Sequence, residues 1–254
     1  MKLISISSAP LTKFCPPEFN IRKGCNTIRL GTLYDFRAEE DEKLRDVGEG
    51  TFSYSIDFPE LTKVSSEWIS AFELEGGGQA QISEMKVGPD GIMIKGMSLS
   101  GSCHNCWIYC LSKNSESAGN ITDTHQDKWF LPVERLESFA SYLVAEIWDG
   151  LVYSDLPESI TNNVSMQEIH KRLSLSFEVR EVDYGLRALT ILREEDLPAS
   201  SIEKVKDSVA FIKPKIFENE SEIRIAIWLH FDGRKISIMN NSKIIKLRPI
   251  DKII

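Results

Sequence analysis

Residues 80–99 read AQISEMKVGPDGIMIKGMSL, and this stretch indicates the fold class. Two runs with strand character, residues 80–87 and 91–99, flank the tetrapeptide GPDG at residues 88–91. Proline presets φ at the first corner of such a turn, and glycine tolerates positive φ. The stretch therefore predicts a β-hairpin, and with it an antiparallel sheet.

Strand-like segments recur on both sides of this hairpin, whereas helical segments are few. The clearest helix covers residues 133–148, where apolar residues recur at three- and four-residue spacing. A shorter helix is expected at residues 202–209, capped by Ser200. A polar loop or lid is expected at about residues 113–128. The other predicted strands cover residues 2–7, 27–36, 51–56, 105–112, 174–184, 188–192, 222–231, 235–239 and 243–247.

Many strands, few helices and no alternation of strand with helix predict an α+β fold of mostly antiparallel sheets. A single large domain over residues 1–254 is expected, because 254 residues can bury one substantial core. No GxGxxG, P-loop, GxSxG, HExxH or EF-hand pattern is present, so the corresponding enzyme and calcium-binding classes are not indicated.

Composition and charge are those of a soluble globular protein. Hydrophobic residues make up 42% and charged residues 27%, and the formal net charge is −8. This acidic balance disfavours nucleic acid as a partner and favours a small molecule or a protein. No apolar stretch approaches the roughly 20 residues that span a bilayer, so no membrane association is expected. Five cysteines cannot all form pairs, which favours reduced thiols and a cytoplasmic location.

The segment CHNCWIYC at residues 103–110 has cysteine and histidine ligands for zinc. A structural zinc site needs four converging ligands, usually as two separated pairs, and the second pair is missing here. Cys106, Ile108 and Cys110 share one face of a strand, which is typical of buried thiols. Zinc remains an alternative, and no metal site is assigned.

The segment KPKIFENESEIR at residues 213–224 is the strongest candidate for chemistry. On an extended chain Glu218, Glu220 and Glu222 share one face, which Arg224 continues. Paired carboxylates suit a reaction at a sugar: one stabilises an oxocarbenium-like transition state, and the other takes a proton from the attacking group. We therefore take Glu222 and Glu220 as candidate catalytic residues and Arg224 as a candidate binding residue. The alternative is a charged edge of a core strand, with Arg224 pairing Glu222.

The segment IRLGTLYDFR at residues 28–37 offers the cation Arg29 and the phenol Tyr34. Arginine can hold a phosphate through two parallel hydrogen bonds, and tyrosine can stack on a flat ring. The two side chains have opposite parity, so both reach one cleft only if Gly31 forms a bulge. Otherwise Tyr34 belongs to the core and Arg29 to a solvated face. Similarly, Glu49 either turns into a cleft at the following glycine or lies in an ordinary turn.

A third segment, CWIYCLS at residues 106–112, is followed by Trp129. A strand, a polar loop and a tryptophan can line a pocket with an aromatic wall, which makes Trp129 a candidate binding residue. The alternative is a core strand with a tryptophan packed beneath a loop.

Taken in order, these segments resemble a widespread bacterial family of unknown function. Its members share an early acidic-glycine turn, a middle strand followed by Trp, and a late F-K…F…E-x-E-x-R block. Here RDVG at residues 45–48 replaces the family's Asn-Asp-Pro turn, and FLP at 130–132 replaces its Tyr-Ala-rich stretch. Several members occur near phage-defence or toxin genes, so the resemblance implies such a role. The matching positions are residues 46–50, residues 108–112, Trp129, Phe211, Lys213, Phe217, Glu220, Glu222 and Arg224.

The layout is also similar, more remotely, to ADP-ribosyltransferases, which bind NAD. That resemblance implies that Arg29 holds the dinucleotide, Tyr34 faces the nicotinamide and Glu222 binds a ribose hydroxyl. Glu220 matches the first Glu of the E-x-E pair that activates the acceptor in some transferases. The usual Ser-Thr-Ser element of a middle strand is not evident.

Three functions are therefore open at this point. The first is an ADP-ribosyltransferase-like or NAD-consuming enzyme that acts at a nucleotide ribose. The second is a non-catalytic interaction protein or sensor subunit of a phage-defence or toxin–antitoxin system. The third is a nuclease of the defence type, which would gather carboxylates around Mg²⁺.

Overall fold

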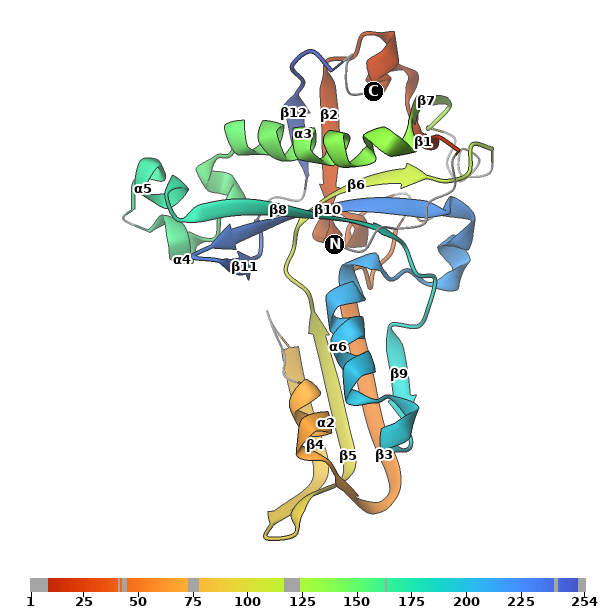
Figure 1. The fold of residues 1–254 in the computed structure, drawn as a ribbon, viewed down its shortest axis with the longest axis vertical. Helices are drawn as coiled ribbons and strands as arrows, with labels where there is room; N and C mark the ends of the chain where they lie inside the picture. The colour runs from red at the N-terminus through yellow and green to blue at the C-terminus, as the bar shows by residue number, and fades with distance from the viewer. Residues whose placement is uncertain are drawn as a thin grey trace.

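The computed structural model describes residues 9–40, 42, 45–72, 78–116, 124–162, 164–239 and 242–250. The strand predicted at residues 2–7 lies outside the described residues, as does part of the predicted loop. The described chain forms two sheets, drawn one above the other in Figure 1. Helices and antiparallel strands are both abundant, which confirms the α+β class.

The upper sheet has eight strands, and β10 lies at its centre. One edge of β10 pairs with β8, and the other pairs first with β6 and then with β11. On its far edge β6 meets β2 and β1, which pair outward with β12 and β7. The strands are β1 Leu11–Cys15, β2 Thr27–Thr32, β6 Trp107–Ser112, β7 Asp127–Leu131, β8 Leu173–Glu181, β10 Glu222–Phe231, β11 Arg234–Ile236 and β12 Lys243–Lys246.

The lower sheet has four strands in the order β4-β5-β3-β9, and it contains the predicted hairpin. The ladder between β4 and β5 runs to the pair Gly88–Gly91, so the turn lies at the two predicted central residues. β9 joins β3 in parallel. The strands are β3 Thr51–Val64, β4 Gly78–Gly88, β5 Gly91–Ser102 and β9 Ala188–Ile191.

Helix α3 covers one face of the upper sheet, and α2 and α6 pack on the lower sheet (Figure 1). The α-helices are α1 Leu33–Arg37, α2 Ser66–Ala71, α3 Leu136–Asp149, α4 Glu158–Thr161, α5 Met166–His170 and α6 Ala199–Ser208. Short 3-10 segments are η1 Pro17–Phe19, η2 Ile21–Lys23, η4 Val133–Arg135, η5 Tyr153–Asp155, η6 Glu194–Asp196, η7 Val209–Phe211 and η8 Lys215–Glu220.

Apolar packing forms two main clusters joined by a third. The upper cluster packs α3 on the eight-stranded sheet, with Phe139 and Leu143 fully buried. The lower cluster packs α2 and α6 on the four-stranded sheet around Trp68 and Ile202. The third cluster lies on the opposite face of the upper sheet and includes Trp228. Burial of these side chains is the main driving force for the arrangement.

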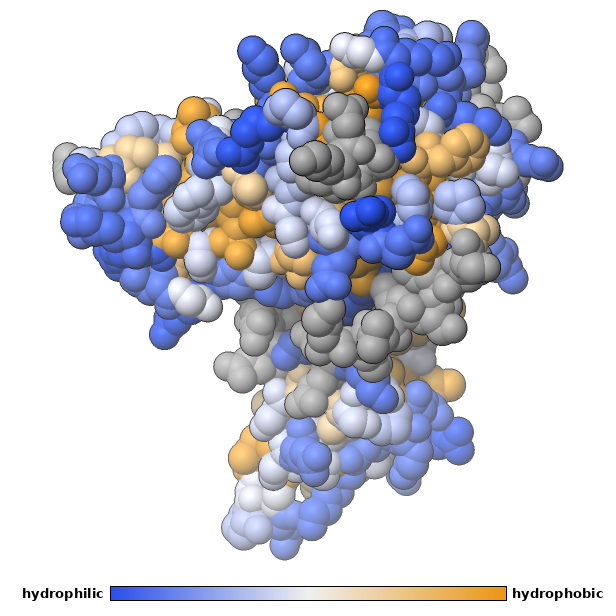
Figure 2. Space-filling view, turned by 45° about the horizontal axis from the view of Figure 1, so that its top comes forward, coloured by the Kyte–Doolittle hydropathy of each residue, from blue (hydrophilic) through white to orange (hydrophobic). Residues whose placement is uncertain are grey.

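On the face shown in Figure 2 hydrophilic side chains predominate, and apolar side chains form separate patches on both halves of the molecule. All five cysteines are free. Among the helices of the described residues, none has the length and apolar character required to cross a membrane.

Three local predictions were wrong. The strand predicted at residues 27–36 ends at Thr32, because its hydroxyl accepts a hydrogen bond from the Asp35 N–H at 3.0 Å and caps α1. Ser200 does not cap α6, which begins at Ala199 after Pro198. The last two residues of the expected polar loop, 127 and 128, begin strand β7, which pairs with β1 along its whole length.

Candidate functional site

The upper sheet is split along one edge of β6. β2 pairs with β6 at Ile108, and β1 pairs with it at Ser112, so the two strands meet β6 at different ends. Between these points lies a cavity of about 400 Å³, lined by β1, β2, β6 and the start of β10. This volume falls in the usual range for small-molecule sites.

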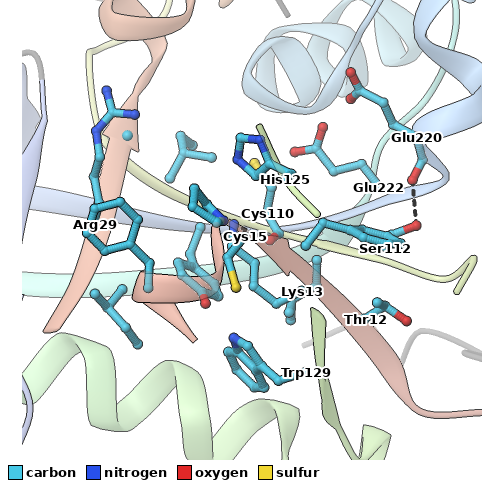
Figure 3. A pocket seen from close by; sticks show the side chains of 18 of the residues that line it. Thr12, Lys13, Cys15, Arg29, Cys110, Ser112, His125, Trp129, Glu220 and Glu222 are labelled. Atoms are coloured by element: carbon cyan, nitrogen blue, oxygen red, sulfur yellow. Dashed lines mark hydrogen bonds between the residues drawn. The ribbon is translucent and has the colours of Figure 1, made fainter. Parts of the chain in front are cut away.

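The cavity has an apolar wall and a polar end. Aromatic rings of Phe19, Phe36, Tyr109 and Trp129 contribute to the wall. In Figure 3, Glu220 and Glu222 stand on one side and Arg29 on the other, with Lys13, Cys110 and His125 between them.

Glu222 is buried and held in its charged form. Its carboxylate accepts from Arg224 Nε at 2.8 Å and faces Lys213 Nζ at 3.0 Å. Burial opposes ionisation, but these two cations outweigh it and hold the pKa of Glu222 well below its usual value. Glu222 is thus a buried anion.

Glu220 has the opposite tendency. Burial, which the ion pair with Lys213 only partly offsets, raises the pKa of Glu220 to about 7, and the neighbouring Glu222 carboxylate adds to the rise. Lys213 lies between the two carboxylates, and although burial opposes its charge, Glu222 and Glu220 raise its pKa. The pKa values of the two carboxyl groups are therefore shifted in opposite directions, that of Glu222 downward and that of Glu220 upward to about 7.

A change of backbone conformation at Ser221 brings the two glutamates together. η8 ends at Glu220, Ser221 has a positive φ of 45°, and β10 begins at Glu222. The prediction of one extended face was therefore wrong for Glu218, which is exposed on η8. It was correct for Glu222 and Arg224, which share a face of β10. Cross-strand pairing with Ser112 and a hydrogen bond from the Glu222 N–H to the Tyr184 hydroxyl at 2.7 Å fix the first residue of β10.

Of the predicted binding residues, Arg29 and Trp129 line the cavity together with both glutamates. Arg29 is at the rim: its side chain is 55% exposed and bonds Asp35 Oδ2 at 2.7 Å. Trp129 is buried in the upper core, so it serves both as core and as cavity wall.

Tyr34 and Arg224 are not among the lining residues. Tyr34 lies on α1, where the Arg37 guanidinium covers its ring at 4.5 Å, and Phe36 of the same helix lines the cavity instead. Arg224 lies behind Glu222, fully buried, and also bonds Glu49 Oε1 at 2.9 Å. Glu49 does turn inward, but its partner is this guanidinium.

Sequence reasoning assigned no role to several lining residues. Lys213 stands in the late motif, and its position seven residues before Glu220 gave no sign that it would bind both carboxylates. Lys13 and Tyr109 come together only because β1 and β6 are neighbours, although 96 positions separate them in sequence. His125, which the sequence analysis did not single out, also lines the cavity.

The cysteine-rich segment is packed as small apolar side chains. Cys106 and Ile108 are buried in the third cluster, and Cys110 packs against it. Across the described part of the chain, no group of three or more His, Cys, Asp or Glu side chains is arranged to hold a metal ion.

Comparison with protein-family models, with curated proteins and with solved structures found no match to this chain.

Proposed function

We propose that the protein is an enzyme that acts at the ribose of a nucleotide, transferring or hydrolysing the bond at the anomeric carbon, with NAD as the first substrate to test. The observation that carries the proposal is the pair Glu220 and Glu222, whose pKa values are shifted in opposite directions at one wall of the cavity. Two titratable groups with diverging pKa values are a common basis for acid and base roles.

The roles follow from the charges. Glu222, whose pKa is held well below its usual value, can stabilise positive charge that develops on the sugar ring when the glycosidic bond breaks. Glu220, with a pKa of about 7, can accept a proton from the attacking hydroxyl or water. The bond from the anomeric carbon to the base breaks, the base leaves with the bonding electrons, and the attacking oxygen forms the new bond.

The remaining lining supports a nucleotide ligand. The rings of Phe19 and Phe36, which line the cavity and keep exposed surface, offer flat apolar surfaces for a base. Arg29, at the rim opposite the glutamates, is placed to face the outer, charged part of the ligand. The family resemblance adds a role in bacterial defence or as a toxin to the proposal, and the odd number of cysteines adds a cytoplasmic location.

The test is the release of base from NAD, followed by chromatography. Glu222→Gln should lower turnover by at least about 100-fold, and Glu220→Gln should lower it while retaining NAD binding. Glu218→Gln is the matched control, because Glu218 is exposed on the same 3-10 segment and outside the cavity. Thermal melts of all three variants separate loss of chemistry from loss of folding. Absence of NAD turnover together with absence of calorimetric binding of NAD and ADP-ribose would contradict the proposal.

A non-catalytic interaction protein is the second candidate, and β4 favours it. Every residue of this eleven-residue strand is exposed, including Ile82 and Val87. It forms the edge of its sheet, and an open edge can pair with a strand of another chain. Under this alternative, proline substitutions in β4 would abolish partner binding, and Glu222→Gln would not.

A further inference from the structure

Lys13 of β1 extends its side chain into the split of the upper sheet. Its ammonium lies 4.5 Å from the centroid of the Tyr109 ring and donates to the Cys110 carbonyl oxygen at 3.0 Å. Cys110 lies between the points where β2 and β1 pair with β6. Lys13 thus occupies the gap that forms the cavity.

The charge of Lys13 is not balanced locally. The other strong cations of the lining have carboxylate partners, Asp35 for Arg29 and both site glutamates for Lys213. Within the described residues, no carboxylate lies at ion-pair distance from the Lys13 ammonium. An ammonium has three N–H donors, of which a single carbonyl oxygen takes one. A partly buried cation of this kind favours a negatively charged ligand.

A second group in the lining also lacks a partner. Thr12 has no exposed surface, and its hydroxyl oxygen makes no hydrogen bond within the described structure. Thr12 pairs with Ser112, which pairs with Glu222, so the three residues form one row across β1, β6 and β10. All three line the cavity. Buried hydroxyls are normally hydrogen-bonded, so Thr12 leaves one unsatisfied polar atom in the row that leads to Glu222.

We propose that Lys13 binds a phosphate of the nucleotide, and that the cavity therefore selects phosphorylated ligands over nucleosides. This inference rests on the proposed function and deepens it, because it names the group that the substrate must carry. Lysine is a compact point charge that suits phosphate oxygens. Arg29, paired with Asp35 at the rim, is then an outer contact, and Lys13 is the inner anion site.

The test uses pyrophosphate and ADP-ribose as probes in calorimetric titrations at low salt. Lys13→Met keeps a chain of similar length over Tyr109 but removes the charge, and should weaken binding of both probes by about tenfold or more. Lys13→Arg should retain most of the affinity. Lys128→Met is the matched control, because Lys128 also donates to a carbonyl oxygen, that of Ser115 at 2.8 Å, and lies over the ring of Phe130, but outside the cavity.

The outcomes separate the two proposals. If wild-type protein binds neither probe, or if Lys13→Met binds them like wild type, the inference is overturned even when NAD is consumed. If pyrophosphate binding depends on Lys13 while NAD is neither bound nor consumed, the anion site stands and the proposed function fails. Melting temperatures check that Lys13→Met is folded, since a purely structural Lys13 would change the melt and not the preference for phosphate.

Discussion

Arg224 Nη1 donates to Glu49 Oε1 at 2.9 Å, although 175 positions separate the two residues in sequence and neither side chain is exposed. Glu49 stands just before β3 of the lower sheet, and Arg224 lies on β10 of the upper sheet. The same guanidinium holds Glu222. The charged wall of the cavity is therefore supported by the junction between the two sheets.

Removing one partner of this ion pair should strongly destabilise the folded protein. We expect Glu49→Ala to lower the free energy of unfolding by about 3–5 kcal/mol, because Arg224 would keep its charge in a buried site with one carboxylate fewer. Glu168→Ala, which breaks the exposed pair with Lys171, should cost at most about 1 kcal/mol. Urea denaturation of both variants checks this. Equal losses of unfolding free energy would show that the buried pair stabilises the fold no more than the exposed pair.

The turn that places Glu49 depends on Gly50. Its φ is +66°, and an added Cβ would lie 2.9 Å from Leu33 Cδ1 and 3.2 Å from Cys103 Sγ. We expect Gly50→Ala to destabilise the protein by more than about 1 kcal/mol. Gly24→Ala is the control, because Gly24 also has positive φ, +98°, but no neighbour within 4 Å. A larger loss at Gly24 would mean that packing at Gly50 is unimportant.

Local patterns predicted much of the fold. The β4–β5 hairpin followed from its turn residues, and β10 begins and ends at the predicted residues 222 and 231. The predictions failed where a single hydrogen bond decides the local structure, as at Thr32, whose hydroxyl starts a helix inside a β-like run. Strand β1 was not predicted, and its pairing with β7 is a long-range contact that no local pattern reveals.

The candidate site was predicted only in part, because local patterns reveal residues close in sequence but not long-range contacts. Glu220 and Glu222 are neighbours in sequence, so their proximity was visible, although a 3-10 segment and Ser221 bring it about and strand alternation does not. The placement of Tyr34 failed because α1 turns it away from the cavity. Lys13 lies at the site because β1 pairs with β6, and no local sequence pattern predicts that pairing.

The thiols of the CHNCWIYC segment should be unreactive in the folded protein. Burial raises the pKa of Cys103 to about 12 and raises the pKa values of Cys106 and Cys110. Because the thiolate is the reacting form, we expect almost no alkylation of these three by iodoacetamide at pH 8 before unfolding. Mass spectrometry of the peptides checks this. Rapid alkylation of the folded chain, with denatured protein as the reference, would contradict the raised pKa values of these thiols.

Glu220 should make stability depend on pH in a direction opposite to that of an ordinary ion-paired carboxyl. Its pKa is about 7 in the folded protein against an ordinary value of 4.5. Between these values the folded state keeps a proton that the unfolded chain has lost, so stability falls as pH rises. The contribution is complete below about pH 4.5 and is lost as pH rises through about 7.

Comparison of wild type with Glu220→Gln isolates this effect. Glutamine cannot titrate, so the unfolding free energy of wild type relative to the variant should decrease from pH 4.5 to pH 7.5. Urea unfolding at several pH values measures it, with Glu218→Gln, an exposed change nearby, as the control. The pKa of Glu222 is lowered, so its ionisation makes both proteins more stable as pH rises. This contribution largely cancels when the two proteins are compared. A difference that rises with pH would mean that Glu220 is an ordinary ion-paired carboxylate beside Lys213, without the raised pKa on which its proposed role as a proton acceptor rests.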